Sequence, residues 1–100
     1  MSWETEYASK LKTADEALSC LKSGMRVYIQ PGCGEPETLV EALMRRAPEV
    51  HDVEIVHMMT MGAAPYVAPE MAGHFRHNAV FIGSNVRETI NEGRADYTSI

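Results

Sequence analysis

The spacing of apolar positions in the first quarter of the chain predicts two short helices. Residues 3–10 form the first, and Thr13 followed by Glu16 has the spacing of a capping box that opens the second. The second helix carries one apolar face, which consists of Ala14, Ala17, Leu18 and Leu21. Gly24 is expected to end this helix, because glycine readily adopts the left-handed conformation that follows a helix.

Runs of β-forming residues then predict the strands. Residues 26–30 and 53–58 predict the first two, residues 79–82 predict the third, and a fourth begins near Ala95. Residues 60–77 show no clear period and contain two prolines and two glycines. A connection of this length exceeds what a compact domain usually needs, so we expect it to be functional or disordered.

Two further helices are predicted between the strands. Residues 36–46 predict one whose inward face consists of Leu39, Val40, Leu43 and Met44. Residues 86–92 predict the other, with Asn85 as its N-cap and Gly93 as its end. Strands that alternate with helices imply right-handed βαβ crossovers. The predicted fold is therefore α/β, with an open, mainly parallel sheet flanked by helices, in a single domain over residues 1–100.

Ligands of such sheets bind beyond the carboxyl ends of the strands. The loops expected there are residues 30–36, 58–65 and 83–85, and we expect them to converge on one crevice. The first has the sequence Gln-Pro-Gly-Cys-Gly-Glu-Pro, in which Pro36 fits the first helical position. Its glycines, Gly32 and Gly34, permit a tight turn that presents backbone amides to a ligand. The alternative is an ordinary strand-to-helix turn whose glycines serve geometry alone.

Better-known glycine loops do not fit this turn. A dinucleotide-binding loop needs glycine at position 37 and a P-loop needs glycine and lysine at 37 and 38, where Glu37 and Thr38 stand. A cysteine phosphatase places arginine six residues after its nucleophile, and the residue six after Cys33 is Leu39. The acidic side chains beside the turn also repel phosphate. The turn is better suited to a carbonyl oxygen that develops charge during a reaction.

Composition narrows the choice of function. The chain has 9 basic and 14 acidic residues, so it lacks the basic surface that nucleic-acid binding requires. No apolar run approaches the roughly 20 residues that span a bilayer, which predicts a cytoplasmic protein without a membrane partner. Cys20 and Cys33 provide no disulfide framework and are expected to be free thiols.

Several segments together resemble a known family. The segments are Ser23-Gly-Met-Arg-Val27, Gly34-Glu-Pro36, Val53-Glu-Ile-Val-His-Met58, Pro69-Glu-Met-Ala-Gly-His-Phe-Arg-His-Asn78 and Asn91-Glu-Gly-Arg-Ala-Asp-Tyr-Thr98. They look like the amino-terminal domain of the acetyl-CoA hydrolase/transferase family, class I CoA-transferases that include 4-hydroxybutyrate CoA-transferase-like enzymes. The resemblance covers nearly the whole chain from Tyr7 onward. Many class I members carry Gly-Gly-Phe ahead of Gly-x-Pro, where this chain has Tyr28-Ile-Gln30.

The resemblance implies a function for the turn and a missing partner. Enzymes of this kind attack an acyl-CoA with a glutamate carboxylate and pass CoA to a small carboxylate through a glutamyl-CoA thioester. That glutamate belongs to a second, carboxy-terminal domain, so we expect a truncated chain with no catalytic residue of its own and no activity alone. Glu35, Glu37 and Glu70 do not match the glutamate motif. Coenzyme A is expected as substrate, with no permanently bound cofactor.

The resemblance also assigns residues to the site. An oxyanion loop is expected from Gly32, Cys33, Gly34, Glu35 and Pro36, and a pocket from Gln30, His57, Met61, Gly62, Ser84 and Asn85. Acyl-CoA thioester hydrolysis is the alternative activity, and a non-catalytic acyl-CoA or carboxylate-binding or oligomerisation module is the alternative of another class. The face meant for the second domain is expected to promote homo-oligomers.

Individual residues admit alternative interpretations. Cys33 at a helix N-terminus could be a reactive thiol, although the adjacent Glu35 disfavours a thiolate. Glu70, His74 and His77 could gather on a helical face as metal ligands, but we expect no metal site, because Gly73 interrupts the segment. His57 is a crevice or core histidine, Ser84 and Asn85 offer polar groups for a carboxylate, and the methionines at 58, 59 and 61 are core packing or an acyl wall.

Overall fold

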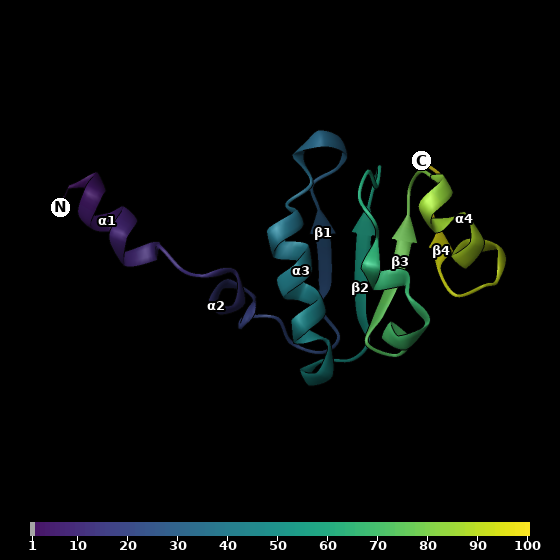
Figure 1. The fold of residues 1–100 in the computed structure, drawn as a ribbon, viewed down its shortest axis with the longest axis horizontal. Coiled ribbons are helices and arrows are strands. Elements are labelled where there is room, and N and C mark those ends of the chain that lie inside the picture. Colours follow the sequence, from purple (N-terminus) through teal and green to yellow (C-terminus); the bar gives the residue numbers. More distant parts are fainter. Residues whose placement is uncertain (1) are drawn as a thin grey trace.

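The computed structural model describes residues 2–100, and helices alternate with strands along most of the chain. Short 3-10 turns add Gly32–Gly34, Ala47–Glu49, Pro65–Val67 and Pro69–Met71. The helices and strands are, in order, α1 (Trp3–Lys10), α2 (Ala14–Leu18), β1 (Arg26–Ile29), α3 (Glu37–Arg46), β2 (Val53–His57), β3 (Phe75–Ala79), α4 (Ser84–Asn91) and β4 (Asp96–Tyr97) (Figure 1).

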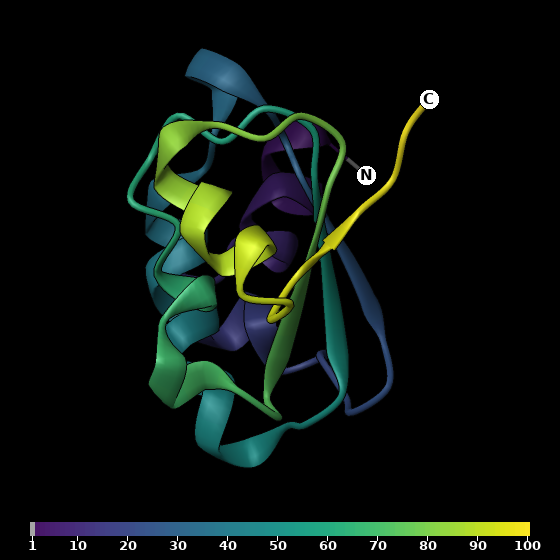
Figure 2. The ribbon, with the colours of Figure 1, turned by 90° about the vertical axis from the view of Figure 1, so that its right-hand side faces the viewer.

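The four strands form one parallel sheet in the order β1-β2-β3-β4. In the register, Ile55 on β2 lies opposite Val27 on β1 and opposite His77 on β3. Each right-handed crossover steps one strand in the same direction, so all the connections lie on one face of the sheet. Figure 2 shows α3, α4 and the long connection together on that side. The predicted α/β fold with a parallel sheet is confirmed.

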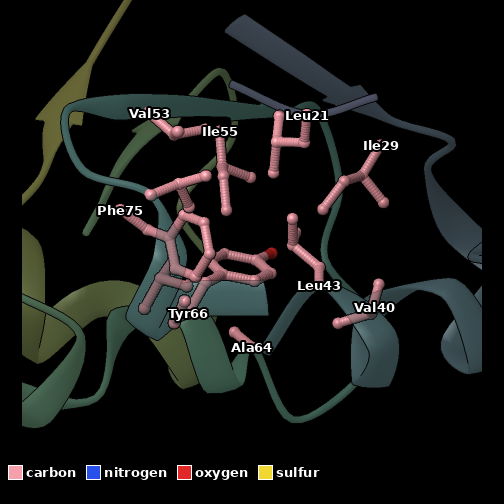
Figure 3. Close-up of a cluster of buried hydrophobic side chains, with 12 residues drawn as sticks. Leu21, Ile29, Val40, Leu43, Val53, Ile55, Ala64, Tyr66 and Phe75 are labelled. Carbon is pink, nitrogen blue, oxygen red and sulfur yellow. The ribbon is translucent and has the colours of Figure 1, made fainter. Parts of the chain in front are cut away.

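The hydrophobic core lies between the covered face of the sheet and the helices. Val53 and Ile55 of β2 are fully buried and pack with Leu43 of α3 and Tyr66 of the long connection (Figure 3). The pattern of β2, in which every second residue is buried, explains this arrangement because alternate side chains of a strand point to opposite faces.

The other face of the sheet is open within residues 2–100. Tyr28 is 58% exposed there, and Arg76 binds the Asp96 carboxylate through Nε at 2.7 Å and Nη2 at 2.8 Å. This contact lowers the pKa of Asp96 and raises the pKa of Arg76, because each charge stabilises the other. Parallel sheets normally have both faces covered, so the open face is unusual for the class.

The third strand begins earlier than the sequence predicts. It spans Phe75–Ala79 rather than residues 79–82, so the prediction was wrong by about one strand length. The reason is that β3 is half-buried: Phe75, His77 and Ala79 point into the core while Arg76 is exposed. Alternation places this segment in the sheet, whereas the more apolar residues that follow lie in the loop after it.

The connection between β2 and β3 is correspondingly shorter than residues 60–77 and is not structureless. It contains the 3-10 turns Pro65–Val67 and Pro69–Met71, and His74 already donates its backbone N–H to Met71 O at 3.0 Å. Tyr66 in this connection is 1% exposed. Each turn begins at a proline, Pro65 or Pro69, because proline suits the first positions of a helical turn. The same prolines interrupt the hydrophobic periodicity of this segment.

Two predictions for the helices are also corrected. The second helix ends at Leu18, well before Gly24, although Leu21 is buried as expected and its carbonyl accepts a hydrogen bond from Arg46 Nη2 at 2.9 Å. On α3, Val40 and Leu43 face inward, but Leu39 is 41% exposed. The buried stripe of α3 therefore excludes Leu39 and includes Ala42 instead.

Helix α1 projects from the body of the protein and buries no residue (Figure 1). Trp3, Tyr7 and Leu11, spaced four residues apart, are 73%, 60% and 65% exposed. Its N-terminus is capped locally by Ser2, whose Oγ accepts the backbone N–H of Thr5 at 3.3 Å. Across residues 2–100, no helix combines the length and apolar character that crossing a bilayer would need.

Candidate functional site

The loops that follow β1, β2 and β3 meet at Gly62. Its backbone N–H donates to Oε2 of Glu35 at 2.8 Å, and its carbonyl accepts from Nδ2 of Asn85 at 2.7 Å. The same Nδ2 group also donates to the carbonyl of Thr60 at 3.1 Å. The predicted convergence of loops 30–36, 58–65 and 83–85 is therefore confirmed, and polar side chains from two of the loops hold the third.

The turn after β1 has a backbone amide available to a ligand, that of Cys33. Gly32 has a φ of +64°, which favours glycine, and its N–H donates to Met59 O at 3.0 Å. Residues Gly32–Gly34 form a 3-10 turn, in which the Gly34 N–H faces the Pro31 carbonyl and the Glu35 N–H donates to Gly32 O at 3.2 Å. Within residues 2–100, the N–H of Cys33 has no acceptor. An amide presented in this way is suited to a carbonyl oxygen that develops negative charge.

Gly34 does not have a positive φ, and its lack of a side chain instead allows the turn to pack closely against Gln30. A Cβ at this position would lie 3.0 Å from Cγ of Gln30, so the turn closes against the end of β1. Pro36, expected at the first helical position, is instead the N-cap residue, and α3 begins at Glu37. The Glu37 N–H bonds to Glu35 O at 3.0 Å, which keeps the turn compact up to the helix.

Asn85 is not the N-cap of its helix. The N-cap is Gly83 and Asn85 is the second residue of α4, so the predicted capping role is wrong. Its amide group is used instead to hold the loop after β2. A Cβ on Gly83 would lie 2.9 Å from Oδ1 of Asn85, which explains the small residue there. Oδ1 is buried and has no hydrogen-bond partner within residues 2–100.

His57, at the end of β2, supports the same loop from below. It is fully buried, and its Nδ1 lies 2.8 Å from both the Tyr66 hydroxyl and the Thr60 hydroxyl. Desolvation lowers the pKa of His57, although the negative charge of Glu35 acts in the opposite direction. The ring thus occupies the core position considered as the alternative to a crevice position, beneath the loop.

A second buried histidine adjoins this network. The ring of His77 lies 5.2 Å from that of Tyr66 between centroids, and its Nδ1 is 3.3 Å from the Ile55 carbonyl. Burial lowers the pKa of His77 to about 4 and raises the pKa of Tyr66 to about 12. Both groups are therefore neutral near pH 7, and the core beneath the site carries no charge from them.

The remaining predicted site residues lie on the surface around these loops. Gln30, Cys33, Met61 and Ser84 are exposed, Met61 by 64%, and Pro36 is half-buried. Exposure leaves all of them accessible to a ligand. The structure makes no further contact between Ser84 and the other loops within residues 2–100.

The metal-ligand arrangement considered from the sequence requires a helix that is not formed. His74 precedes β3 and its Nδ1 donates to the Val50 carbonyl at 2.7 Å, while His77 is buried within β3. Within residues 2–100, no group of three histidine, cysteine or acidic side chains is arranged to hold a metal ion.

A pocket of about 210 Å³ opens beside the contact between Glu35 and Gly62. Three carboxylates line it, from Glu35, Glu37 and Glu41, together with Val40, Ala63 and Pro65. Their negative charge opposes the binding of phosphate groups. The Cys33 amide of the turn, rather than this acidic pocket, is the group suited to an oxyanion.

Comparison with known proteins decides the family. The family model described as "Acetyl-CoA hydrolase/transferase N-terminal domain" matches residues 1–100. The chain belongs to this family. It is 45% identical over 98 residues to a 4-hydroxybutyrate coenzyme A transferase of Clostridium kluyveri, covering 98% of the chain and 23% of that protein. It is 35% identical over 103 residues to a butyryl-CoA:acetate CoA-transferase of Anaerostipes caccae, covering 100% and 23%.

A solved structure shares the fold of this chain. RipA from Yersinia pestis superposes with a TM-score of 0.86 at 22% sequence identity, over 100% of this chain and 26% of RipA. The chain thus spans about a quarter of the length of the relatives that it matches. The family resemblance inferred from the sequence is confirmed by the family model.

Sequence reasoning missed the residues that hold the loops together. Thr60 and Tyr66 lie in the stretch without periodicity, and nothing there indicates that their hydroxyls meet His57. Glu35 was assigned to the turn for its backbone, whereas its carboxylate makes the contact with Gly62. A polar residue near the start of the helix that follows a strand is the one signal for such contacts, and it is present at Glu35, before α3, and at Asn85, in the first turn of α4.

Proposed function

We propose that this domain forms the amino-terminal half of a CoA-transferase site that moves CoA between an acyl-CoA and a small carboxylate. The observation that carries the proposal is the turn after β1, where Cys33 presents an amide without an acceptor within residues 2–100, at the point where three loops meet. The 45% identity to a 4-hydroxybutyrate coenzyme A transferase supports the same assignment.

The chemistry requires a glutamate nucleophile that we place outside this chain. Its carboxylate attacks the thioester carbonyl, the C–S bond breaks, and an acyl-glutamyl anhydride and a CoA thiolate form. The thiolate then attacks the glutamyl carbonyl, which releases the first acid and leaves a glutamyl-CoA thioester. The acceptor carboxylate reverses these steps. Each attack puts negative charge on a carbonyl oxygen, and the amide of Cys33 would stabilise that charge.

Within this domain, the other site residues act by position. The exposed Met61 and the half-buried Pro36 offer an apolar wall beside the turn, and the exposed Ser84 offers a hydroxyl donor to a substrate carboxylate. Asn85 acts through the loop after β2, because its amide group already donates to the Thr60 and Gly62 carbonyls. We expect the isolated chain to be inactive, because it contributes no nucleophile and does not exclude water from an anhydride.

Acyl-CoA hydrolysis is the second candidate, favoured by the family description, which includes hydrolases. Transfer and hydrolysis share the first half-reaction and differ in whether a carboxylate or water resolves the intermediate. A non-catalytic acyl-CoA-binding module is the alternative of another class, and it would form no acylated intermediate at all.

The test has two steps. The coding sequence is first read past Ile100; a continuation that encodes a second domain with the glutamate supports the enzyme, and a stop codon supports the module. The longest encoded protein is then incubated with an acyl-CoA and treated with borohydride. Reduction of a glutamyl-CoA thioester to an alcohol, found by mass spectrometry at one glutamate, is the expected result. Absence of any modified glutamate in a protein that transfers CoA would overturn the mechanism.

A further inference from the structure

We propose that Glu35 is a positioning residue, which clamps the amide-bearing turn after β1 to the loop after β2 and so fixes the direction of the Cys33 and Gly34 amides. Its catalytic meaning rests on the proposed function, but the clamp itself is a property of this chain alone. The carboxylate thus belongs to the framework of the site and is neither a nucleophile nor a ligand for substrate.

The geometry of Glu35 supports this assignment. Its Oε2 accepts the Gly62 N–H at 2.8 Å, a hydrogen bond between a carboxylate and a partly buried amide across 27 residues of sequence. Charged acceptors make such bonds about twice as strong as neutral ones. Glu35 follows the turn directly, so the bond ties the end of the turn to the loop after β2.

Gly62 is shaped to receive the carboxylate. A Cβ at this position would lie 3.0 Å from both Oε1 and Oε2 of Glu35, closer than side chains normally approach. Its φ is not positive, so the backbone does not demand glycine and the close approach of the carboxylate accounts for the residue. The absence of a side chain at Gly62 thus allows the Glu35 carboxylate to reach the Gly62 N–H.

Asn85 completes the clamp from the opposite side. It donates to the carbonyl groups of Gly62 and Thr60, while Glu35 accepts from the Gly62 N–H. The loop after β2 is therefore held by one anchor from the loop after β1 and one from the start of α4. In addition to this side-chain bond, the Gly32 N–H donates to Met59 O at 3.0 Å. Two hydrogen bonds therefore connect the turn after β1 to the loop after β2.

The experiment measures the clamp in the 100-residue chain by NMR. The amide proton signal of Gly62 is expected to move in Glu35→Gln, because a neutral oxygen replaces the charged acceptor of its hydrogen bond. In Glu35→Ala, hydrogen exchange at Gly62 is expected to accelerate about ten- to a hundredfold, the loss of a hydrogen bond to a charged group. The signals of Cys33 and Gly34 should shift with it.

Two further variants serve as partner and control. Gly62→Ala disrupts the same contact from the other side, so its effect on the Cys33 and Gly34 signals should match that of Glu35→Ala and not add to it in the double variant. Glu37→Ala removes a neighbouring charge whose carboxylate has no hydrogen-bond partner within residues 2–100. It should leave all three signals unchanged. Equal exchange at Gly62 in wild type and Glu35→Ala would overturn the clamp.

Activity separates positioning from direct catalysis. In the longest encoded protein, Glu35→Ala is expected to lower kcat about ten- to a hundredfold with little change in KM, because a displaced oxyanion loop acts in the transition state. Glu35→Gln keeps an oxygen that accepts the Gly62 N–H and should recover most of the rate. If Glu35→Gln is as impaired as Glu35→Ala, the carboxylate acts directly and the positioning role is wrong. A wild type without CoA-transfer activity would count against the proposed function, and the NMR result would still decide the clamp.

Discussion

The hydroxyl of Tyr66 lies 2.8 Å from Nδ1 of His57, and both residues are almost fully buried. Because Thr60 also lies 2.8 Å from the same nitrogen, the three side chains join the end of β2 to two points of the loop after it. The loop after β2 is therefore fixed from below by the core as well as from its sides by Glu35 and Asn85.

Removing the hydroxyl should loosen this loop. Tyr66→Phe keeps the ring in the core and is expected to reduce the free energy of unfolding by about 1 kcal/mol, the net contribution of a buried hydrogen bond. Urea unfolding measures the change. Tyr97→Phe is the control, because the Tyr97 ring is 53% exposed. An equal loss in both variants would show that the network does not stabilise the loop.

The buried His77 predicts a loss of stability in acid. Its pKa is near 6.5 in the unfolded chain and about 4 in the folded one, so the unfolded state binds more protons between these values. Its contribution is fully present above about pH 6.5 and falls by roughly 3 kcal/mol as the pH drops to about 4. His57, whose pKa burial also lowers, acts in the same direction.

Chemical unfolding at about pH 7 and about pH 4.5 tests this prediction. His77→Leu removes the titrating ring and should flatten the dependence of stability on pH. A His77→Leu protein as sensitive to acid as the wild type would assign the effect to the carboxylates instead.

Asn85 is expected to contribute more to the free energy of unfolding than other polar residues of α4. Asn85→Ala leaves the carbonyl groups of Thr60 and Gly62 without their side-chain donor, which is expected to cost about 1–3 kcal/mol in partly buried surroundings. Asn91→Ala, at the exposed end of the same helix, should cost less than about 0.5 kcal/mol. Thermal unfolding of the two variants compares them directly, and similar losses would argue against the anchor.

Two leucines of α3 provide a matched test of the packing. Leu43 is 2% exposed and Leu39 is 41% exposed. Leu43→Ala is expected to destabilise the chain by about 2–5 kcal/mol, because it leaves a cavity in the core. Leu39→Ala should cost under about 1 kcal/mol. Urea unfolding measures both losses. A larger loss in Leu39→Ala than in Leu43→Ala would support the inward position that the sequence predicted for Leu39.

Self-association remains a prediction, which the sequence places at the exposed edge of the last strand. The structure has a second sheet edge at β1. Beside it lies a groove of about 140 Å³, with an apolar lining from Leu18, Val27, Tyr28, Ile29, Pro36, Leu39, Val40 and Leu43. Exposed strand edges beside apolar surface favour pairing with a second copy. Sedimentation velocity should show dimers or larger species whose fraction rises with concentration, and Tyr28→Lys should reduce it. A wild type that stays monomeric at high concentration would contradict the prediction.

The sequence predicted the parts of the fold that depend on local chemistry. Thr13 and Glu16 form the expected capping box, with the Glu16 N–H bonded to Thr13 Oγ1 at 3.2 Å, and Gly93 has the positive φ that ends α4. The alternation of helices and strands then gave the parallel sheet and placed three loops at one edge. Local signals suffice for these features, because neighbouring residues determine them.

The features that it did not predict depend on distant residues. The alternation in Phe75–Ala79 is a weaker signal than the apolar run that follows it, and pairing with β2 decides which segment joins the sheet. Asn85 has the sequence context of a helix cap, yet two carbonyl groups of a loop more than 20 residues away hold its amide. Such contacts become visible when the three loops are brought together in space.

The projection of α1 has a practical consequence for how this protein is studied. Trp3 is the single tryptophan of the chain, and it lies on that exposed helix, 73% accessible to solvent. Its fluorescence emission therefore reports the surroundings of the helix and should change little when the distant core melts. The same indole is a sensitive reporter for anything that covers α1, and a shift of its emission to shorter wavelength would reveal that contact without any added label.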